Sequence, residues 1–467
     1  MLADSRNVRL SSRISFRGRR TPSRHAQLRR TQEDGMADTS WDTIDRYMIL
    51  SSDAHAGAET HQYRDYLDKR WHEDFDAWVV TLAHPFIDLS DPEAAVNWDP
   101  ARRLAAMDAE GDTGQVLFPN TIPPFFDILV HLSGVPKSRE EFTRKWAGLR
   151  AHNRWLVEFC QADPLRLKGL VQLLPNDVDV AVAEARWAKE TGVIGGVMLP
   201  GVPPNHPVPP YFHEKYDRLW EACAELELPV HQHQGTGSPE ADYDSPAATP
   251  IWFAELDRWT QRTLLHLVFG GVFERHPRLK FVWTEMWGIR WILEELDRME
   301  RRLPELRSEG AWGVGLGRAD DPRRMNFSYF GSPAIDGLSL SPTEYWHRNC
   351  YVGASLLPRH EMRYRHSVGV DRLMWGMDFP HPEGSTHHAV EALRATFYDV
   401  PEHECRVMLA GVAADVYGFD VDALTATAQR IGPPVTEVHQ RLAEADFPLA
   451  PGAAFDASPA LEELIVS

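Results

Sequence analysis

Cysteine and long apolar segments are both scarce in this sequence. Its four cysteines are far apart and form no CxxC pair: Cys160, Cys223, Cys350 and Cys405. This spacing predicts reduced thiols in a cytoplasmic protein rather than a disulfide framework. No apolar run approaches the roughly 20 residues that cross a bilayer. We therefore expect neither a membrane anchor nor a disulfide-stapled scaffold.

Positive charge is also in short supply. The chain has 49 Lys and Arg against 68 Asp and Glu, which gives a formal net charge of −19. Such an acidic chain argues against nucleic acid and against an anionic membrane surface as partners. Hydrophobic residues make up 43% of the chain and aromatic residues 10%, which predicts a well-filled globular core. A length of 467 residues suits one large α/β barrel with insertions, or two or three ordinary domains.

Residues 1–35 differ in composition from the rest of the chain. They contain nine Arg, no Lys and three acidic residues. An Arg-rich, Ser-rich and acid-poor segment is typical of an organelle transit peptide. The alternative, which we favour, is upstream sequence ahead of a true start at Met36. In both cases we expect 1–35 to be disordered and 36–467 to form a single domain that includes the C-terminal helices.

Short apolar strands alternate with helices along the chain, most regularly beyond residue 110. Eight strands are expected; the first starts near residue 47, and the others start near 115, 167, 195, 229, 280, 350 and 372. Strand–helix alternation predicts parallel βαβ units, and eight such units predict a (β/α)8 TIM barrel. A long excursion follows the first strand, and Leu303–Pro342 forms an insertion between the sixth and seventh strands, either a lid or an oligomer arm. Helices beyond Pro401 should pack outside the barrel.

Metal-competent side chains stand at the ends of four expected strands, the first, fifth, sixth and eighth: Asp53, His55, His233, Glu285 and Asp378. The carboxyl ends of barrel strands meet at one mouth. Residues of these types on strands 1, 5 and 8 can hold one divalent ion and leave a position open for water or substrate. Any one of them alone could be a capping Asp or a hydrogen-bonded core His. For His231, two residues before His233, we favour the interpretation as a core histidine. The set predicts a metal site.

Five segments occur in a specific order along the chain: DAHAG at 53–57, LPVHQHQGTG at 228–237, GVFERHPRLKFVWTEMWGIRW at 271–291, LMWGMDFPHPEG at 373–384 and MLAGVAADVYGF at 408–419. Through them the chain resembles the amidohydrolase-related family, the group that includes aminocarboxymuconate-semialdehyde decarboxylase. The resemblance implies a metal-dependent barrel enzyme that acts on C–C, C–O or C–N bonds of small acids and aromatic compounds. It implies metal ligands at Asp53, His55, the strand-5 histidine and Asp378, and the family's P-V-x-x-H pattern selects His233.

Two positions depart from the family pattern. Many relatives have H-x-H or E-x-H where this chain begins with Asp53, and a carboxylate there favours Fe, Mn or Mg over Zn. The family's decarboxylases have a catalytic His at the end of strand 6, where this chain has Glu285. That difference argues against a decarboxylase. It suits a hydrolase in which Glu285 handles a proton, or a second metal, although the absence of a bridging Lys or Glu after Met198 favours one ion.

Three functions are consistent with these residues. The first is a metal-dependent hydrolase of a small organic acid, ester, amide or ring C–C bond. In it the ion lowers the pKa of a bound water, Asp378 accepts the proton, Glu285 is the second catalytic carboxylate and His381 contacts substrate. The second is a non-oxidative decarboxylase of an aromatic or unsaturated carboxylic acid. The third is an inactive barrel used as a binding scaffold, which the filled ligand positions disfavour.

The implied cofactor is one divalent metal ion, with Zn, Fe and Mn as the candidates. The implied partner is a small-molecule substrate, and we expect a homo-oligomer, a dimer. Substrate identity is not encoded in any motif of the sequence.

Overall fold

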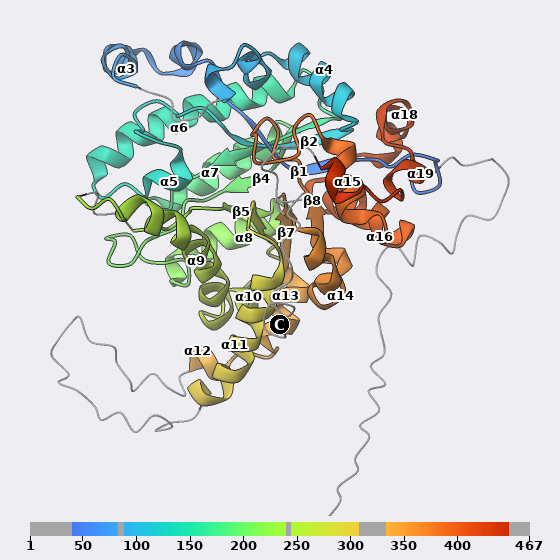
Figure 1. The fold of residues 1–467 in the computed structure, drawn as a ribbon. Coiled ribbons are helices and arrows are strands. Elements are labelled where there is room, and N and C mark those ends of the chain that lie inside the picture. Colours follow the sequence, from blue (N-terminus) through green and yellow to red (C-terminus); the bar gives the residue numbers. More distant parts are fainter. Residues whose placement is uncertain (1–39, 83–87, 240–243, 308–332, 356, 448–467) are drawn as a thin grey trace, which may run out of the picture. The chain divides into compact units, whose positions relative to one another are not determined.

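Eight short parallel strands follow one another around a single sheet: β1 Leu50–Ala56, β2 Gly114–Pro119, β3 Leu167–Gln172, β4 Ile194–Met198, β5 Val230–His233, β6 Phe281–Thr284, β7 Cys350–Ala354 and β8 Leu373–Trp375. The last strand returns to the first through a parallel bridge between Ala54 and Phe379. The computed structural model describes residues 40–82, 88–239, 244–307, 333–355 and 357–447 (Figure 1). The predicted (β/α)8 barrel is confirmed.

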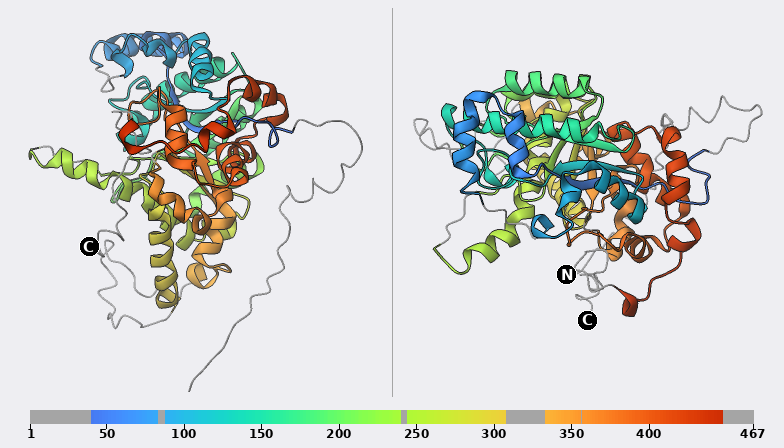
Figure 2. Two further views of the ribbon diagram at one scale, coloured as in Figure 1. Left: turned by 45° about the vertical axis from the view of Figure 1, so that its right-hand side comes forward. Right: turned by 90° about the horizontal axis from the view of Figure 1, so that it is seen from above.

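Helices connect the strands and cover them from outside (Figure 2). Parallel neighbours require such crossovers, because a tight turn cannot join them. The longer connecting helices are α4 Pro100–Glu110, α6 Arg139–Cys160, α7 Val178–Glu190, α8 Asp217–Glu225, α9 Ala248–Phe269, α11 Arg290–Arg307, α13 Pro342–Asn349 and α15 Ala389–Phe397. Across the described segments, none of the helices has the length and apolarity that a membrane crossing requires.

Shorter helical pieces fill the connections. The expected excursion after β1 contains η1 Thr60–Gln62, α2 Tyr63–Tyr66, η2 Lys69–Trp71, α3 His72–Val79, η3 Asp88–Ser90 and η4 Ala94–Asn97. Other short pieces are α5 Val130–Ser133, η5 Glu214–Tyr216, α10 Val272–Arg275, α12 Pro333–Asp336, η7 Arg359–Tyr364, α14 Arg365–Val368 and η8 Val370–Arg372. Most of the expected insertion Leu303–Pro342 lies outside the described residues.

The ends of α4 illustrate how the sequence sets the helix boundaries. The Asp99 side chain accepts a hydrogen bond from the backbone N–H of Ala101 at 2.9 Å, and Pro100 occupies the first helical position. Gly111 then ends the helix with φ 77°, a left-handed conformation that glycine adopts without a steric penalty. This start and stop deliver the chain directly to β2.

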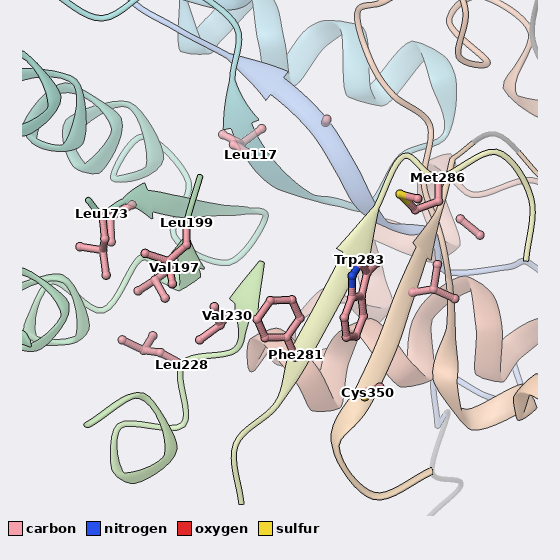
Figure 3. Packing of buried hydrophobic residues seen from close by; sticks show 14 of the residues in the cluster. Leu117, Leu173, Val197, Leu199, Leu228, Val230, Phe281, Trp283, Met286 and Cys350 are labelled. Carbon is pink, nitrogen blue, oxygen red and sulfur yellow. The ribbon is translucent and has the colours of Figure 1, made fainter. Parts of the chain in front are cut away.

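The main core lies between the strands and the surrounding helices. Alternate strand residues face opposite sides, so Phe281 and Trp283 of β6 both point outward (Figure 3). Their rings lie 4.6 Å apart between centroids. Trp283 also contacts Trp291 of α11 and Trp346 of α13, at 6.2 Å and 6.0 Å. This aromatic packing anchors β6, and with it the position of Glu285.

A second, smaller core closes the amino-terminal end of the barrel. Inward-facing residues such as Leu50, Val116 and Met374 pack there against Val416 and Phe419 from the C-terminal tail. The tail begins with α16 Glu402–Arg406, a π-helical turn Val407–Gly411 and α17 Val412–Tyr417, followed by α18 Val421–Ile431, α19 Val435–Val438 and η10 Glu444–Asp446. The tail was expected to pack outside the barrel, and α17 does so at its amino-terminal end, where it forms part of the barrel floor.

Both boundaries of β1 differ from the sequence-based expectation. β1 was expected at Tyr47–Ser52, but it runs through Ala56 because Ala54 and His55 pair with Leu117 and Phe118 of β2. Asp53 and His55 therefore belong to the strand and do not follow it.

Of the two compact units of the chain, Met1–Thr39 lies outside the described residues, and Ser40–Ser467 contains every element named above. The predicted domain boundary at residue 36 stays a prediction.

Candidate metal centre and active site

β1 places a carboxylate and an imidazole side by side at the barrel mouth. Asp53 and His55 are two residues apart and face the same side, with 3.4 Å between Asp53 Oδ1 and His55 Nε2. Both side chains are fully buried. The Ser355 hydroxyl, just after β7, donates to Asp53 Oδ2 at 2.6 Å and fixes the carboxylate. Burial raises the pKa of Asp53 above its ordinary value, although His55 acts in the opposite direction.

The imidazoles of His55 and His233 are oriented by backbone carbonyls. His55 Nδ1 lies 3.3 Å from the carbonyl oxygen of Pro119, and His233 Nδ1 lies 3.4 Å from that of Gln234. A carbonyl oxygen only accepts, so Nδ1 carries the hydrogen in both rings. The Nε2 lone pair of each ring is thereby directed into the mouth. Outer partners of this kind typically orient histidines that bind metals.

Glu285 and Asp378 follow β6 and β8, and both have left-handed backbones. Their φ angles are 58° and 55°, a region that costs a non-glycine residue about 1–2 kcal/mol. Neighbouring strands hold them there. The N–H of Glu285 donates to the carbonyl of Gly353 at 3.2 Å, and that of Asp378 donates to the carbonyl of Asp53 at 2.9 Å. Strained residues that the surroundings fix in this way concentrate at functional sites.

These carboxylates converge on the two Nε2 atoms. Glu285 Oε2 lies 2.7 Å from His233 Nε2 and 3.7 Å from His55 Nε2. Asp378 Oδ1 approaches His55 Nε2 from the other side, at 3.1 Å. Asp53, His55, His233 and Glu285 offer ligand atoms that all lie within 4.8 Å of one another. His55, Glu285, Asp378 and His381 form a second, overlapping group by the same criterion.

Several buried atoms at this point make close contacts with one another but satisfy no hydrogen-bond geometry among the described residues: Asp53 Oδ1, His55 Nε2, His233 Nε2, Glu285 Oε2 and Asp378 Oδ2. Three are carboxylate oxygens and two are imidazole nitrogens, which is a donor set suited to a divalent cation. A buried, uncompensated carboxylate is costly. The arrangement therefore requires positive charge at its centre, and it supports one divalent metal ion.

The pKa shifts point the same way. Burial lowers the pKa of His55, but contacts with Asp378, Asp53 and Glu285 outweigh it and raise that pKa well above the ordinary value. His233 behaves alike, because Glu285 raises its pKa against the effect of burial. Burial would raise the pKa of Glu285, yet His233 and His55 hold it well below its usual range. The cluster attracts cations, whether protons or a metal ion.

His381 forms a hydrogen-bonded bridge beside the cluster. Its ring stacks on His55 with centroids 4.1 Å apart. Nδ1 lies 3.0 Å from Asp378 Oδ1, and Nε2 lies 3.0 Å from Asn120 Oδ1. Burial and the charge of His55 lower the pKa of His381, but Asp378 outweighs them and raises it. His381 is buried, so its predicted contact with substrate would come from the inner side of the mouth.

The orientation of the Asn120 amide assigns the protons of this bridge. Asn120 Nδ2 donates to Asp88 Oδ2 at 2.7 Å and to Asn97 Oδ1 at 2.8 Å. Its Oδ1 therefore faces His381 and accepts a hydrogen bond from Nε2–H. A neutral imidazole has only one N–H, so with that hydrogen on Nε2 the 3.0 Å contact between His381 Nδ1 and Asp378 Oδ1 is a hydrogen bond only when the pair holds one more proton.

The structure thus brings together all six residues singled out in the sequence, while their individual roles stay predictions. His231 is not among them: its nitrogens bond to Val197 O and to the Tyr417 hydroxyl, both at 3.1 Å, as expected for a core histidine.

Sequence reasoning missed three neighbours of the site: Asn120, His131 and Ser355. Asn120 and Ser355 directly follow β2 and β7, so their positions at strand ends could have revealed them. His131 lies in the short α5, where no pattern distinguishes it. Its ring centroid is 4.8 Å from that of His233, and burial lowers its pKa well below the ordinary value. A neutral His131 therefore borders the cluster.

The amidohydrolase family model matches residues 98–419. The chain belongs to the amidohydrolase family. This amidohydrolase is 22% identical over 332 residues to gamma-resorcylate decarboxylase from Rhizobium sp., over 69% of this chain and 85% of the relative. It is also 26% identical over 235 residues to decarboxylase orsB from Emericella nidulans, over 47% of this chain and 60% of the relative. The resemblance read from the five segments is confirmed.

Solved structures share the fold of this amidohydrolase. An amidohydrolase from Mycobacterium avium subsp. paratuberculosis K-10 has a TM-score of 0.56 at 18% identity, over 80% of this chain and 99% of that one. A 5-carboxyvanillate decarboxylase from Novosphingobium aromaticivorans, complexed with manganese and 4-hydroxy-3-methoxy-5-nitrobenzoic acid, has a TM-score of 0.53 at 19% identity, over 80% and 97%. Both curated relatives and the Novosphingobium structure are named as decarboxylases, and the Mycobacterium structure is named as an amidohydrolase.

Proposed function

We propose that this amidohydrolase is a metal-dependent, non-oxidative decarboxylase of a hydroxylated aromatic carboxylic acid. The gamma-resorcylate and 5-carboxyvanillate of its relatives are both aromatic rings that carry a carboxyl group and a phenolic oxygen. Support from the site itself comes from one observation, the bridge in which His381 Nδ1 lies 3.0 Å from Asp378 Oδ1 and Nε2 lies 3.0 Å from Asn120 Oδ1, an arrangement that can hold one proton between Asp378 and His381.

That proton distinguishes the two chemistries. A hydrolase needs a vacant base at this position to take a proton from water. A decarboxylase needs an acid, because the ring carbon must gain a proton as it loses CO2. In this proposal the Asp378–His381 pair holds that proton before substrate arrives and acts as the acid. His233 and His55 hold the pKa of Glu285 well below its usual range, which argues against Glu285 as the proton donor.

In this proposal Asp53, His55, His233 and Asp378 would hold the metal ion. Glu285 Oε2 adds a further negative charge next to His233. The mixture of carboxylates and imidazoles suits Mn or Fe at least as well as Zn. A bound ion would polarise the carboxylate and phenolic oxygens of the substrate.

The residues of the chain then carry the proton through the reaction. The ring carbon that bears the carboxylate takes the proton shared by Asp378 and His381. The bond between that carbon and the carboxylate breaks, its electron pair restores the aromatic ring, and CO2 leaves. The pair regains one proton from solvent, so each turnover consumes one proton and releases one CO2.

The test uses protein loaded with Mn²⁺ and two sets of compounds. One set holds hydroxybenzoic acids, including gamma-resorcylate and 5-carboxyvanillate, and the other holds phenyl esters, lactones and anilides of similar size. We expect CO2 release from at least one acid, and its loss in Asp378→Asn. Hydrolysis of the second set without CO2 release from the first would contradict the proposal and restore the hydrolase hypothesis.

A further inference from the structure

Asp88 lies outside the metal cluster, in η3 of the excursion after β1, and joins two buried amides. Its Oδ2 accepts hydrogen bonds from Asn120 Nδ2 at 2.7 Å and from Asn97 Nδ2 at 3.3 Å. Asn97 Nδ2 donates its other hydrogen to the carbonyl of Ala94 at 3.1 Å. Both asparagines are fully buried, whereas Asp88 is half-buried. Every N–H of the two amides therefore has an acceptor.

The carboxylate of Asp88 gives this small network its direction. A carboxylate only accepts hydrogen bonds, so each asparagine must turn its NH2 group toward it. If the Asn120 amide rotated by half a turn, its oxygen would lie against Asp88 Oδ2 and a buried N–H would lose its acceptor. An unsatisfied buried group of this kind costs about 1–3 kcal/mol. Asp88 thereby keeps Asn120 Oδ1 directed at His381.

We propose that Asp88 is a positioning residue that determines which nitrogen of His381 carries the hydrogen, through Asn97 and Asn120. With Asp88 in place, the hydrogen is on Nε2, and Nδ1 can share the reactive proton with Asp378. Without it, Asn120 is free to present NH2 to Nε2, and the hydrogen moves to Nδ1. Asp378 Oδ1 would then accept a hydrogen bond from Nδ1–H, and the direction of the hydrogen bonds along the bridge would be reversed.

This inference rests on the proposed decarboxylation, because it concerns the acid of that reaction. It assigns a function to the excursion after β1, for which the sequence predicts none. Asp88 also lines a surface groove together with Asp91, Arg102 and Phe379. Asp91 is a matched control, since its Oδ1 caps the backbone N–H of Glu93 at 2.8 Å and makes no contact with the two amides.

The first experiment compares Asp88→Asn with Asp91→Asn, both loaded with Mn²⁺. We expect kcat of Asp88→Asn to fall about 10- to 100-fold, within the range for a misplaced proton donor. KM and bound metal should stay within about twofold, because the cluster is untouched. Asp91→Asn should match the wild type. Unchanged kcat in Asp88→Asn, or equal losses in both variants, would overturn the proposal.

A reciprocal exchange separates positioning from simple stability. In the double variant Asp88→Asn/Asn120→Asp, the carboxylate moves next to His381 and still accepts from Nε2–H, while position 88 supplies NH2. We expect kcat to recover to within about fivefold of the wild type. A double variant no better than Asp88→Asn would contradict the inference. If Asp88→Asn alone fails to fold, kcat of the double variant still tests the role of Asp88.

A spectroscopic measurement keeps the inference distinct from the proposed function. Nitrogen-15 shifts of the His381 ring, assigned with His381→Gln, report which nitrogen carries hydrogen, independently of turnover. Nε2 should be protonated in the wild type and in the double variant, but not in Asp88→Asn. If the wild type decarboxylates nothing, the function fails while this readout still tests Asp88. Identical ring spectra in all three proteins would overturn the role of Asp88.

Discussion

Two histidines on β5 have opposite chemical environments, although they lie two residues apart and face the same side. His231 is at the barrel floor, where Val197 O and the Tyr417 hydroxyl satisfy both of its nitrogens. Burial lowers its pKa to about 3. His233 is at the mouth, where Nε2 meets Glu285 and the pKa is raised. A histidine is therefore a neutral structural residue at the barrel floor and part of a charged cluster at the barrel mouth.

The difference between floor and mouth lies in which atoms are left without a partner. At the floor, the tail residue Tyr417 completes the hydrogen bonds and stacks on His231 with ring centroids 5.5 Å apart. At the mouth, the strands end with unpaired Nε2 and carboxylate oxygen atoms that converge. A barrel that satisfied both levels would be more stable, but it would have nothing with which to hold a cation or move a proton.

Removing the histidine at the mouth should have the largest effect on this comparison. In His233→Ala a ligand is removed from an open site, so we expect bound metal to be lost and turnover to fall to background, while the circular dichroism spectrum stays that of a folded barrel. Metal content by elemental analysis is the measurement. A full equivalent of metal in the purified variant would show that His233 is not a ligand and would contradict the predicted ligand set.

Asp378→Asn should have the next largest effect. Asn keeps the shape and one acceptor oxygen, so part of the metal should remain, but it cannot share the proton with His381. We expect turnover to fall by roughly 10²–10⁴, the scale for loss of a positioned acid or base. The companion variant Glu285→Gln should weaken metal binding more than proton delivery. If Glu285→Gln lost more turnover per bound metal than Asp378→Asn, Glu285 after β6 would be the acid in place of Asp378.

At the floor, His231→Ala should change stability and leave the chemistry intact. The variant opens a cavity and leaves the Tyr417 hydroxyl without its partner, which together should lower the free energy of unfolding by roughly 3 kcal/mol. Urea unfolding measures this change, and metal content with kcat should stay near wild type. Lost metal at unchanged stability would mean that His231, and not His233, belongs to the site.

Metal removal should have a smaller effect that depends on pH. Without metal, His55 and His233 have pKa values above the unfolded value of 6.5, so their contribution to stability is complete below about pH 6.5 and is lost as pH rises through the raised values. A bound ion occupies the same Nε2 atoms and prevents that loss. The melting-temperature difference between Mn²⁺-loaded and chelated protein should therefore grow from pH 6 to pH 8. A difference that shrinks would contradict the cation site.

Much of this arrangement was predictable from the sequence because barrel strands end at one mouth. The strand count followed from alternation, and Asp53, Glu285 and Asp378 followed from their places at strand ends. The choice between His231 and His233 was harder, since both share a face, and it depended on the family pattern. The floor role of Tyr417 was not predictable, because the tail is apolar and periodicity does not say which surface it covers.

The proton network was the least predictable part. Asp88 and Asn97 lie in an excursion without periodicity, and their contacts with Asn120 arise only when that excursion folds over β2. The same limit affected the functional hypothesis. Glu285, where the resemblance implies histidine in the decarboxylases, argued for hydrolysis, whereas the proposed proton donor after β8 depends on hydrogen bonds of His381 that no sequence pattern indicates.

The central claim is that the mouth delivers a proton to a ring carbon in exchange for CO2. The most direct measurement is turnover of a hydroxybenzoic acid in D2O by the Mn²⁺-loaded protein, followed by mass and NMR analysis of the product. The account predicts one deuterium, located at the carbon that lost the carboxylate, for each CO2 released. Product that carries oxygen from labelled water with no CO2, or no deuterium at that carbon, would contradict it.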